Sequence, residues 1–218
     1  MNQTILHILC EGKTEKRFAD KVLKPYLHPL SVKSVDIGGM HNYAQVKNNI
    51  NALFKQYPDN DYEQHLFTSM FDLYALSNDF PAYKEAVQIS DPYQQVEKLE
   101  AAFKEEIQSK QFLPYIQLHE FEALVFCGLE FLKADYPDKA KGIERLKEIL
   151  EKYDGKPERI NDSYDTAPSR RIIKEIGKQY NKPQSGTYVT AQVGIPALKE
   201  RCPHFKKWME KLEELGKQ

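Results

Sequence analysis

The sequence predicts an α/β fold, in which an open, mainly parallel sheet is flanked by helices and followed by a helical C-terminal part. Over residues 4–118, four short apolar runs of strand length alternate with segments of helical spacing. The first run is apolar at nearly every position, as expected for a strand buried on both faces. After residue 118 only helical spacing remains. This alternation is typical of a parallel sheet covered by helices.

The first strand is expected at Thr4–Cys10, directly before Glu11 and Gly12. Glycine permits a sharp turn, and Thr14 is positioned to cap the helix that follows. A second strand is expected at Val32–Ile37, where two glycines stop it.

The next helix is expected at Tyr43–Tyr57, because its apolar residues form one stripe. His65–Phe71 is expected to be a third strand that leads into Asp72. Asp91 is followed by proline, which favours a helix start at that point. Phe112–Leu118 is the fourth expected strand.

The C-terminal part is predicted to be helical. Its expected helices are Ala123–Leu132, Ala140–Tyr153, Ser169–Tyr180, Ile195–Arg201 and Phe205–Leu215. We predict a catalytic core at residues 1–132 and a helical extension at 133–218 packed on it, with a single domain as the alternative. The stretch from Gly155 to Pro168 is the best candidate for a mobile connection.

Composition favours a soluble cytoplasmic protein. The chain has 218 residues, 41% hydrophobic and 29% charged, which is ordinary for a globular protein. No apolar run approaches the ~20 residues that span a bilayer, and the N-terminus does not resemble a signal peptide. We therefore expect no association with membranes. The three cysteines are far apart in sequence, so we expect reduced thiols.

Charge is unevenly distributed along the chain. Residues 168–207 contain nine basic and two acidic residues, a net charge of +7, which leaves −8 for the rest of a chain whose total is −1. An acidic body with a basic C-terminal third could combine a metal site with a phosphate-binding surface. The alternative is that these charges are only solvated helix faces.

Three of the expected strands end in carboxylates. Glu11 follows the first strand, Asp72 the third, and Glu120 and Glu122 the fourth. The carboxyl ends of parallel strands lie along one edge of a sheet, where ligands bind. Carboxylates gathered there repel one another unless they hold a cation, and Mg²⁺ or Mn²⁺ accepts such oxygen ligands. The alternative is that Glu11 and Glu120 are simply acidic residues at helix N-termini.

Five segments carry a resemblance to a known family: EGKTEKRF, MFDLYALSNDFP, PYIQLHEFEALVF, INDSYDTAPSRRI and CPHFKKW. The opening EGKTE after an apolar strand resembles the EGxTE start of Toprim domains, the fold of topoisomerases, primases and OLD-type nucleases. More narrowly, the chain resembles a Toprim-like bacterial family of unknown function that is often encoded beside AAA-type ATPases. The five segments span residues 11–208.

The resemblance implies a Mg²⁺-dependent site for phosphodiester chemistry, acting in antiphage defence with an AAA-type ATPase as partner. One position departs from the pattern. Toprim nucleases carry DxD on the third strand, whereas here Tyr74 replaces the second aspartate. Asp79 could substitute for it only if the intervening turn folds back. Tyr74 cannot replace a carboxylate as a ligand for a divalent cation at neutral pH, so the sequence leaves undecided whether there is a second metal site.

The acidic candidates have different expected roles. Glu11 is a metal ligand or the general base, and Asp72 is the best single metal ligand. Glu15 lies one helical turn after Glu11 and could join the metal site or face solvent. Because side chains alternate in a strand and diverge in a helix, only one of Glu120 and Glu122 is expected to point inward.

The remaining candidates are a histidine and four basic residues. His119 could orient a carboxylate, act as the acid for the leaving oxygen, or cap the turn. The candidates for binding nucleic acid are Lys13, Arg170, Arg171 and Lys174. Arginine matches phosphate oxygens bidentately, and the two arginines lie at an expected helix N-terminus.

We therefore expect a metal-dependent nuclease with a catalytic set of Glu11, Asp72, His119 and Glu120. Two alternatives remain open. One is nucleotidyl transfer, and the other is an inert scaffold that binds an ATPase or nucleic acid, an alternative that Tyr74 keeps open. The sequence does not distinguish DNA from RNA as the substrate.

Overall fold

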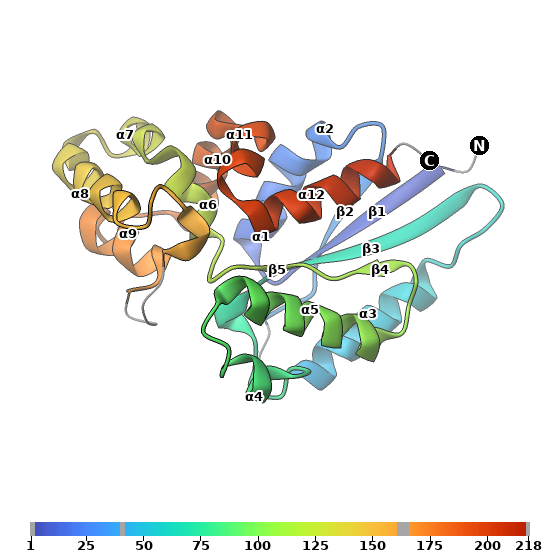
Figure 1. Ribbon diagram of the computed structural model, residues 1–218. Helices are drawn as coiled ribbons and strands as arrows, with labels where there is room; N and C mark the ends of the chain where they lie inside the picture. The colour runs from blue at the N-terminus through green and yellow to red at the C-terminus, as the bar shows by residue number, and fades with distance from the viewer. Residues whose placement is uncertain (1–2, 40–41, 161–165, 217–218) are drawn as a thin grey trace.

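The computed structural model describes residues 3–39, 42–160 and 166–216. Its centre is a five-stranded sheet in the order β2-β1-β3-β4, with β5 also paired to β3, and every pairing is parallel. The strands are β1 (Gln3–Cys10), β2 (Ser31–Asp36), β3 (Glu63–Asp72), β4 (Phe112–Leu113) and β5 (Ile116–Gln117). The expected α/β fold with an open parallel sheet is confirmed (Figure 1).

Helices cover both faces of the sheet. On one face, Leu6 and Ile8 of β1 belong to a core cluster that also contains residues of α1 and α12. Leu9 of the same strand belongs to a second cluster, formed with α3 and α5 on the other face (Figure 1). The alternation of side chains along β1 therefore supplies both cores, which explains why the strand is apolar at nearly every position.

The helices of the first half follow the sequence closely. They are α1 (Lys13–Phe18), extended by the π-turn η1 (Ala19–Leu23) into α2 (Lys24–Tyr26), then α3 (Tyr43–Gln56), α4 (Tyr83–Ala86) and α5 (Pro92–Ile107). Asp91 caps α5, accepting hydrogen bonds from the backbone N–H groups of Tyr93 and Gln94. The expectation that Thr14 caps α1 is wrong, because the helix begins at Lys13 with Gly12 as its N-cap.

The fourth expected strand is interrupted. Instead of one strand over Phe112–Leu118, the chain forms the two short strands β4 and β5. Pro114 lies between them and has no N–H to donate to the ladder, which explains the break. The following helix is also shorter than expected: α6 (Glu122–Val125) passes into the 3-10 segment η3 (Phe126–Phe131), where Gly128 has non-helical backbone angles.

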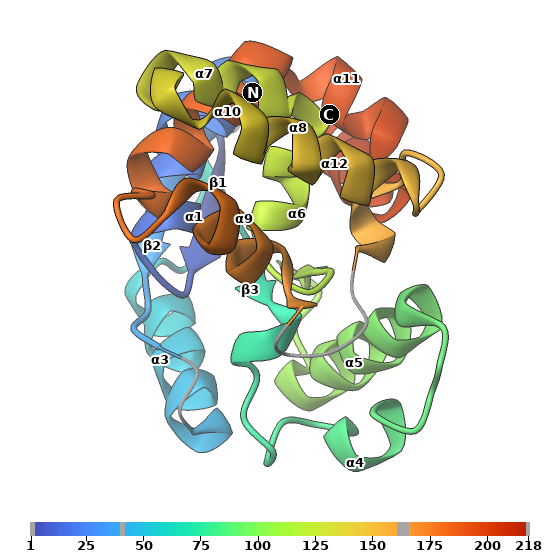
Figure 2. The ribbon, with the colours of Figure 1, turned by 90° about the vertical axis from the view of Figure 1, so that its left-hand side faces the viewer.

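The C-terminal part is helical, as expected. It contains α7 (Leu132–Asp135), η4 (Pro137–Lys139), α8 (Ala140–Glu151), η5 (Pro157–Arg159), α9 (Pro168–Ile176), η7 (Lys182–Gly186), α10 (Thr187–Val193), α11 (Ile195–Arg201) and α12 (Pro203–Leu215). Helices α6–α9 lie beyond the carboxyl ends of the strands (Figures 1 and 2). In the part of the chain that the structure describes, no helix is both long and apolar enough to cross a bilayer.

The last helix returns to the sheet. The indole Nε1 of Trp208 in α12 donates a hydrogen bond of 2.8 Å to Oγ1 of Thr68 in β3. The Trp208 ring stacks on Tyr115 with ring centroids 4.1 Å apart. Residues on both sides of the predicted boundary at residue 132 thus share one hydrophobic cluster. The division into two domains stays a prediction.

Candidate metal centre

Three carboxylates meet at the carboxyl edge of the sheet. Glu11 follows β1 and Asp72 ends β3, and these neighbouring parallel strands end side by side because Cys10 is paired with Met70. Glu15 reaches the same place from the first turn of α1. Each of the three acids offers an oxygen within 4.8 Å of the others. Glu11 Oε2 also accepts a 2.9 Å hydrogen bond from the backbone N–H of Asp72, so it ties β1 to β3.

A second acidic pair lies beside this group and is occupied by a lysine. Nζ of Lys182 is 3.4 Å from Oε2 of Glu120 and 3.4 Å from Oε2 of Glu122. Both carboxylates therefore face the same ammonium group, and the expectation that only one would point inward is wrong. Residues 118–121 form an irregular turn in which His119 has a φ of +63°, so neither strand nor helix geometry relates the two glutamates.

Burial opposes ionisation of these acids. Burial and the charge of Glu15 raise the pKa of Glu11 to about 8. Burial and the charge of Glu11 raise the pKa of Asp72 well above its ordinary value. Burial raises the pKa of Glu122 to about 7, although Lys182 opposes this effect. A group of acids that destabilise one another in this way is typical of a functional site, and a bound cation would relieve the repulsion.

The available oxygens fit a hard cation. Oδ1 of Asp72 and Oε1 of Glu122 are buried and accept no hydrogen bond from the residues that the structure describes. A buried carboxylate oxygen normally has a partner, because leaving it without one is energetically costly. Together with Glu11 and Glu15, these oxygens are of the type that Mg²⁺ and Mn²⁺ bind.

A pocket opens next to the acids. Its volume is about 340 Å³, and it is lined by Asp72, Tyr74, Ala75, Glu120, Ser169, Arg170, Ile173 and Lys182. One wall comes from α9, so Arg170 is brought to the acidic site as the charge distribution suggested. Two basic and two acidic side chains thus line one pocket, an arrangement that suits a metal ion together with a phosphate group.

The other predicted nucleic-acid contacts do not line this pocket. Arg171 is turned inward: its Nε donates to the carbonyl of Thr166 at 2.6 Å, and Nη2 donates to the Tyr153 hydroxyl at 3.3 Å. Its guanidinium is therefore used within the fold. Lys174 and Lys13 are exposed, on α9 and at the start of α1. The expected mobile connection includes residues 161–165, which lie outside the described residues, as does part of the segment INDSYDTAPSRRI.

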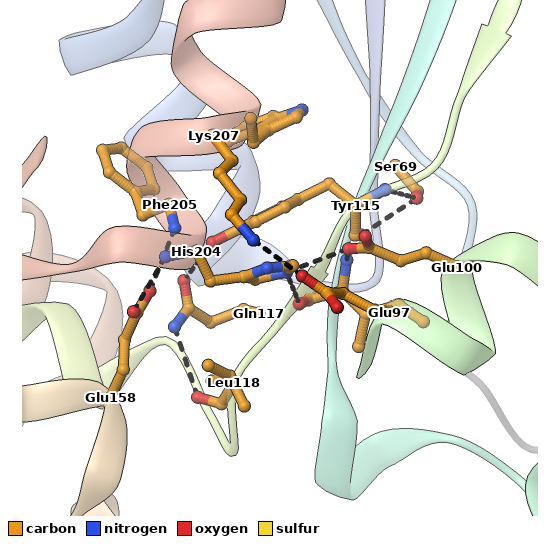
Figure 3. Close-up of polar contacts among 12 residues, drawn as sticks. Ser69, Glu97, Glu100, Tyr115, Gln117, Leu118, Glu158, His204, Phe205 and Lys207 are labelled. Carbon is orange, nitrogen blue, oxygen red and sulfur yellow. Dashed lines mark hydrogen bonds and ion pairs between the residues drawn. The ribbon is translucent and has the colours of Figure 1, made fainter. Parts of the chain in front are cut away.

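His119 bonds to the backbone next to the site. Its Nε2 lies 3.0 Å from the carbonyl oxygen of Glu158, so Nε2 carries the proton. Burial lowers the pKa of His119 to about 4, so the ring is neutral at physiological pH. The Glu158 carboxylate in turn accepts hydrogen bonds of 3.0 Å from the backbone N–H groups of His204 and Phe205, at the start of α12 (Figure 3). This geometry favours orienting the turn over donating a proton.

Asp79 is not brought to the acidic group. Its carboxylate is exposed and accepts hydrogen bonds of 3.1 and 3.2 Å from the backbone N–H of Tyr43, the first residue of α3. Tyr74 lines the pocket at the position where DxD would supply its second aspartate. Among the described residues, the group of three acids therefore gains no further carboxylate from the turn after β3.

Lys182 is the site residue that the sequence did not single out. It counts there only as one of nine basic residues, because its acidic partners are 60 and 62 residues away. Burial by itself would lower its pKa, but the charges of Glu122, Glu120 and Asp72 outweigh that effect and raise it. Near Lys182 the sequence shows only Asn181 and Pro183, which indicate the start of a helix. They do not indicate which residues the lysine contacts.

Fold and site together define a parallel α/β protein with a partly buried carboxylate centre at the carboxyl edge of its sheet. The chain belongs to the family described as "Domain of unknown function (DUF4276)", whose model matches residues 10–213. The fold is also similar to the C-terminal region of the Xanthomonas campestris pv. campestris OLD protein. That match has 17% identity and a TM-score of 0.46, and covers 97% of this chain and 95% of the other. No curated protein sequence matches the chain.

Proposed function

We propose that the protein is a metal-dependent phosphodiesterase that hydrolyses nucleic acid, with Mg²⁺ or Mn²⁺ as its cofactor. The observation that carries the proposal is the group formed by Glu11, Glu15 and Asp72, whose oxygens lie within 4.8 Å of one another. Asp72 also lines the pocket that contains Arg170 and Lys182. Metal-dependent hydrolysis of a phosphodiester uses both features: ligands for a cation and positive charge for the phosphate.

The residues divide into two sets by charge. Glu11, Glu15 and Asp72 would hold the cation, which when bound supplies Lewis acidity toward a phosphate oxygen. Arg170 and Lys182 would bind and orient the phosphate, Arg170 through its planar fork and Lys182 as a point charge. The backbone hydrogen bond from Asp72 to Glu11 keeps the two metal-binding strands in register.

The proposed polymer substrate has its support in the basic residues around the pocket. Arg170 at the pocket and Lys174 one turn along α9 can follow a phosphate backbone away from the metal centre. The AAA-type ATPase partner and the role in antiphage defence rest on the family resemblance alone. Co-purification of the chain with the product of a neighbouring ATPase gene tests that partnership.

The test is cleavage of supercoiled plasmid and of RNA, in parallel, with Mg²⁺ or Mn²⁺. Asp72→Asn should reduce cleavage by about 100-fold or more, the scale of a lost catalytic group. Glu130→Gln, at an exposed glutamate on η3, is the matched control and should cleave normally.

Metal binding can be measured independently of cleavage. At a Mn²⁺ concentration of 100 times Kd, the folded state gains about 2.7 kcal/mol by mass action, and Asp72→Asn should lose that gain.

If the wild-type chain cleaves neither DNA nor RNA, with or without the ATPase, the proposal of a nuclease is refuted and the alternative of an inert scaffold takes its place.

A further inference from the structure

We propose that this centre holds one divalent cation rather than two, and that the ammonium group of Lys182 takes the place of a second cation beside Glu120 and Glu122. The inference rests on the proposed function, because it concerns the same site. It assigns to Lys182 a role in setting the number of metal ions.

The ammonium lies between the two glutamates. Its Nζ is 3.4 Å from Oε2 of each, and the two carboxylates are almost enclosed, with side-chain exposures of 12% for Glu120 and 2% for Glu122. The side chain of Lys182 is 40% exposed, so it enters the acidic site from the solvent side. A second divalent cation bound by this pair would have to displace the ammonium or lie beside it, where like charges repel.

The backbone that carries Lys182 is fixed in place. Ser185, three residues later, bonds to the Tyr136 hydroxyl at 2.8 Å and is buried. Gly186 packs so closely on the ring of Phe121 that a Cβ at this position would lie 2.9 Å from a ring carbon. Phe121 is the residue between the two glutamates. Lys182 is thus positioned by packing against the turn that carries its partners, unlike an exposed lysine that only happens to be nearby.

The rest of the centre provides ligands for one ion. Glu11, Glu15 and Asp72 form the one group of three or more possible metal ligands among the described residues. Beyond Asp72, the turn after β3 places Tyr74 at the pocket, so this position carries a phenol and not a second carboxylate. Asp79, the nearest following aspartate, binds the N-terminus of α3 instead. A fixed ammonium group can supply the remaining positive charge next to a phosphate.

The number of bound ions tests the inference. Mn²⁺ is titrated into the protein by calorimetry, and the ions retained after gel filtration are counted by elemental analysis. Wild type should bind one Mn²⁺. Lys182→Met removes the charge at similar length and should bind two, whereas Lys182→Arg keeps a positive charge and should bind one. The circular dichroism spectra and melting temperatures of the variants verify that each is folded, and Lys182→Gln is the second neutral variant if methionine prevents folding.

The outcomes separate the two proposals. Two Mn²⁺ ions in the wild type would overturn the role of Lys182 and leave the metal-dependent function intact. One ion in both wild type and folded Lys182→Met would also overturn it, because the ammonium would then not be what excludes the second ion. No bound ion in the wild type would instead refute the metal centre and the proposed function with it.

Discussion

Replacing Glu11 with glutamine should stabilise the metal-free protein, even though the change disables the proposed site. Glu11 is half-buried beside Glu15 and Asp72, and desolvation together with the charge of Glu15 raises its pKa to about 8. Glutamine has nearly the same shape, and its carbonyl oxygen can still accept the hydrogen bond from the Asp72 backbone. The substitution therefore removes a charge that the fold tolerates poorly and keeps the contact that joins the strands.

The sign of the pH dependence follows from the raised pKa. The folded state holds the Glu11 proton more tightly than the unfolded chain, so this group favours folding at low pH. That contribution is lost as the pH rises from about 4.5 to about 8. If Glu11 titrated alone, the loss at pH 7 would be about 3 kcal/mol. Because the neighbouring acids share the repulsion, we expect Glu11→Gln to gain roughly 1–3 kcal/mol over wild type at pH 7–8.

Urea unfolding in EDTA at pH 5, 6.5 and 8 measures the effect. Glu11→Gln and wild type should have similar free energies of unfolding at pH 5 and diverge as the pH rises. The exposed Glu130→Gln should follow the wild-type curve. Saturating Mn²⁺ should reverse the order, because the ion stabilises only the protein that can bind it. Parallel curves for wild type and Glu11→Gln in EDTA would refute the idea that the charge of Glu11 destabilises the metal-free fold.

Three further variants test the surroundings of the site. Glu158→Gln should destabilise the protein by about 1–3 kcal/mol, because a single amide oxygen cannot replace both carboxylate oxygens at the start of α12. Urea unfolding measures this loss. An unchanged midpoint would mean that water satisfies that helix end. Arg170→Ala should weaken nucleic-acid binding and flatten its salt dependence in a filter-binding titration. Arg171→Ala should lower the melting temperature, because its guanidinium bonds within the fold; an unchanged melting temperature would contradict this structural role.

Much of the fold could be predicted because it is determined by local patterns. Strand β1 is buried from Ile5 to Cys10 and is apolar there except at His7, and that run is visible in the sequence. The start of α5 was predicted correctly because Asp91 and the following proline act on the helix locally. Predictions failed where one residue outweighed the pattern, as Pro114 does between β4 and β5. The position of α12 on the sheet depends on Trp208 and Thr68, which are 140 residues apart, and no local pattern indicates that contact.

In the candidate site, the sequence indicated the acidic residues but not the lysine that pairs with two of them. A parallel sheet brings the carboxyl ends of its strands to one edge, so the sequence could predict that Glu11 and Asp72 share that edge. The pairing of β1 with β3, which makes them neighbours, is a finding of the structure. The cation beside them could not be predicted, because Lys182 comes from a helical segment whose path depends on the packing of Phe121 and Gly186. The sequence alone suggests that only bound metal ions neutralise the acidic cluster. In the structure, Lys182 already supplies one positive charge beside Glu120 and Glu122. The number of bound metal ions, and not only their presence, is therefore the measurement that distinguishes this centre from a site with two metal ions.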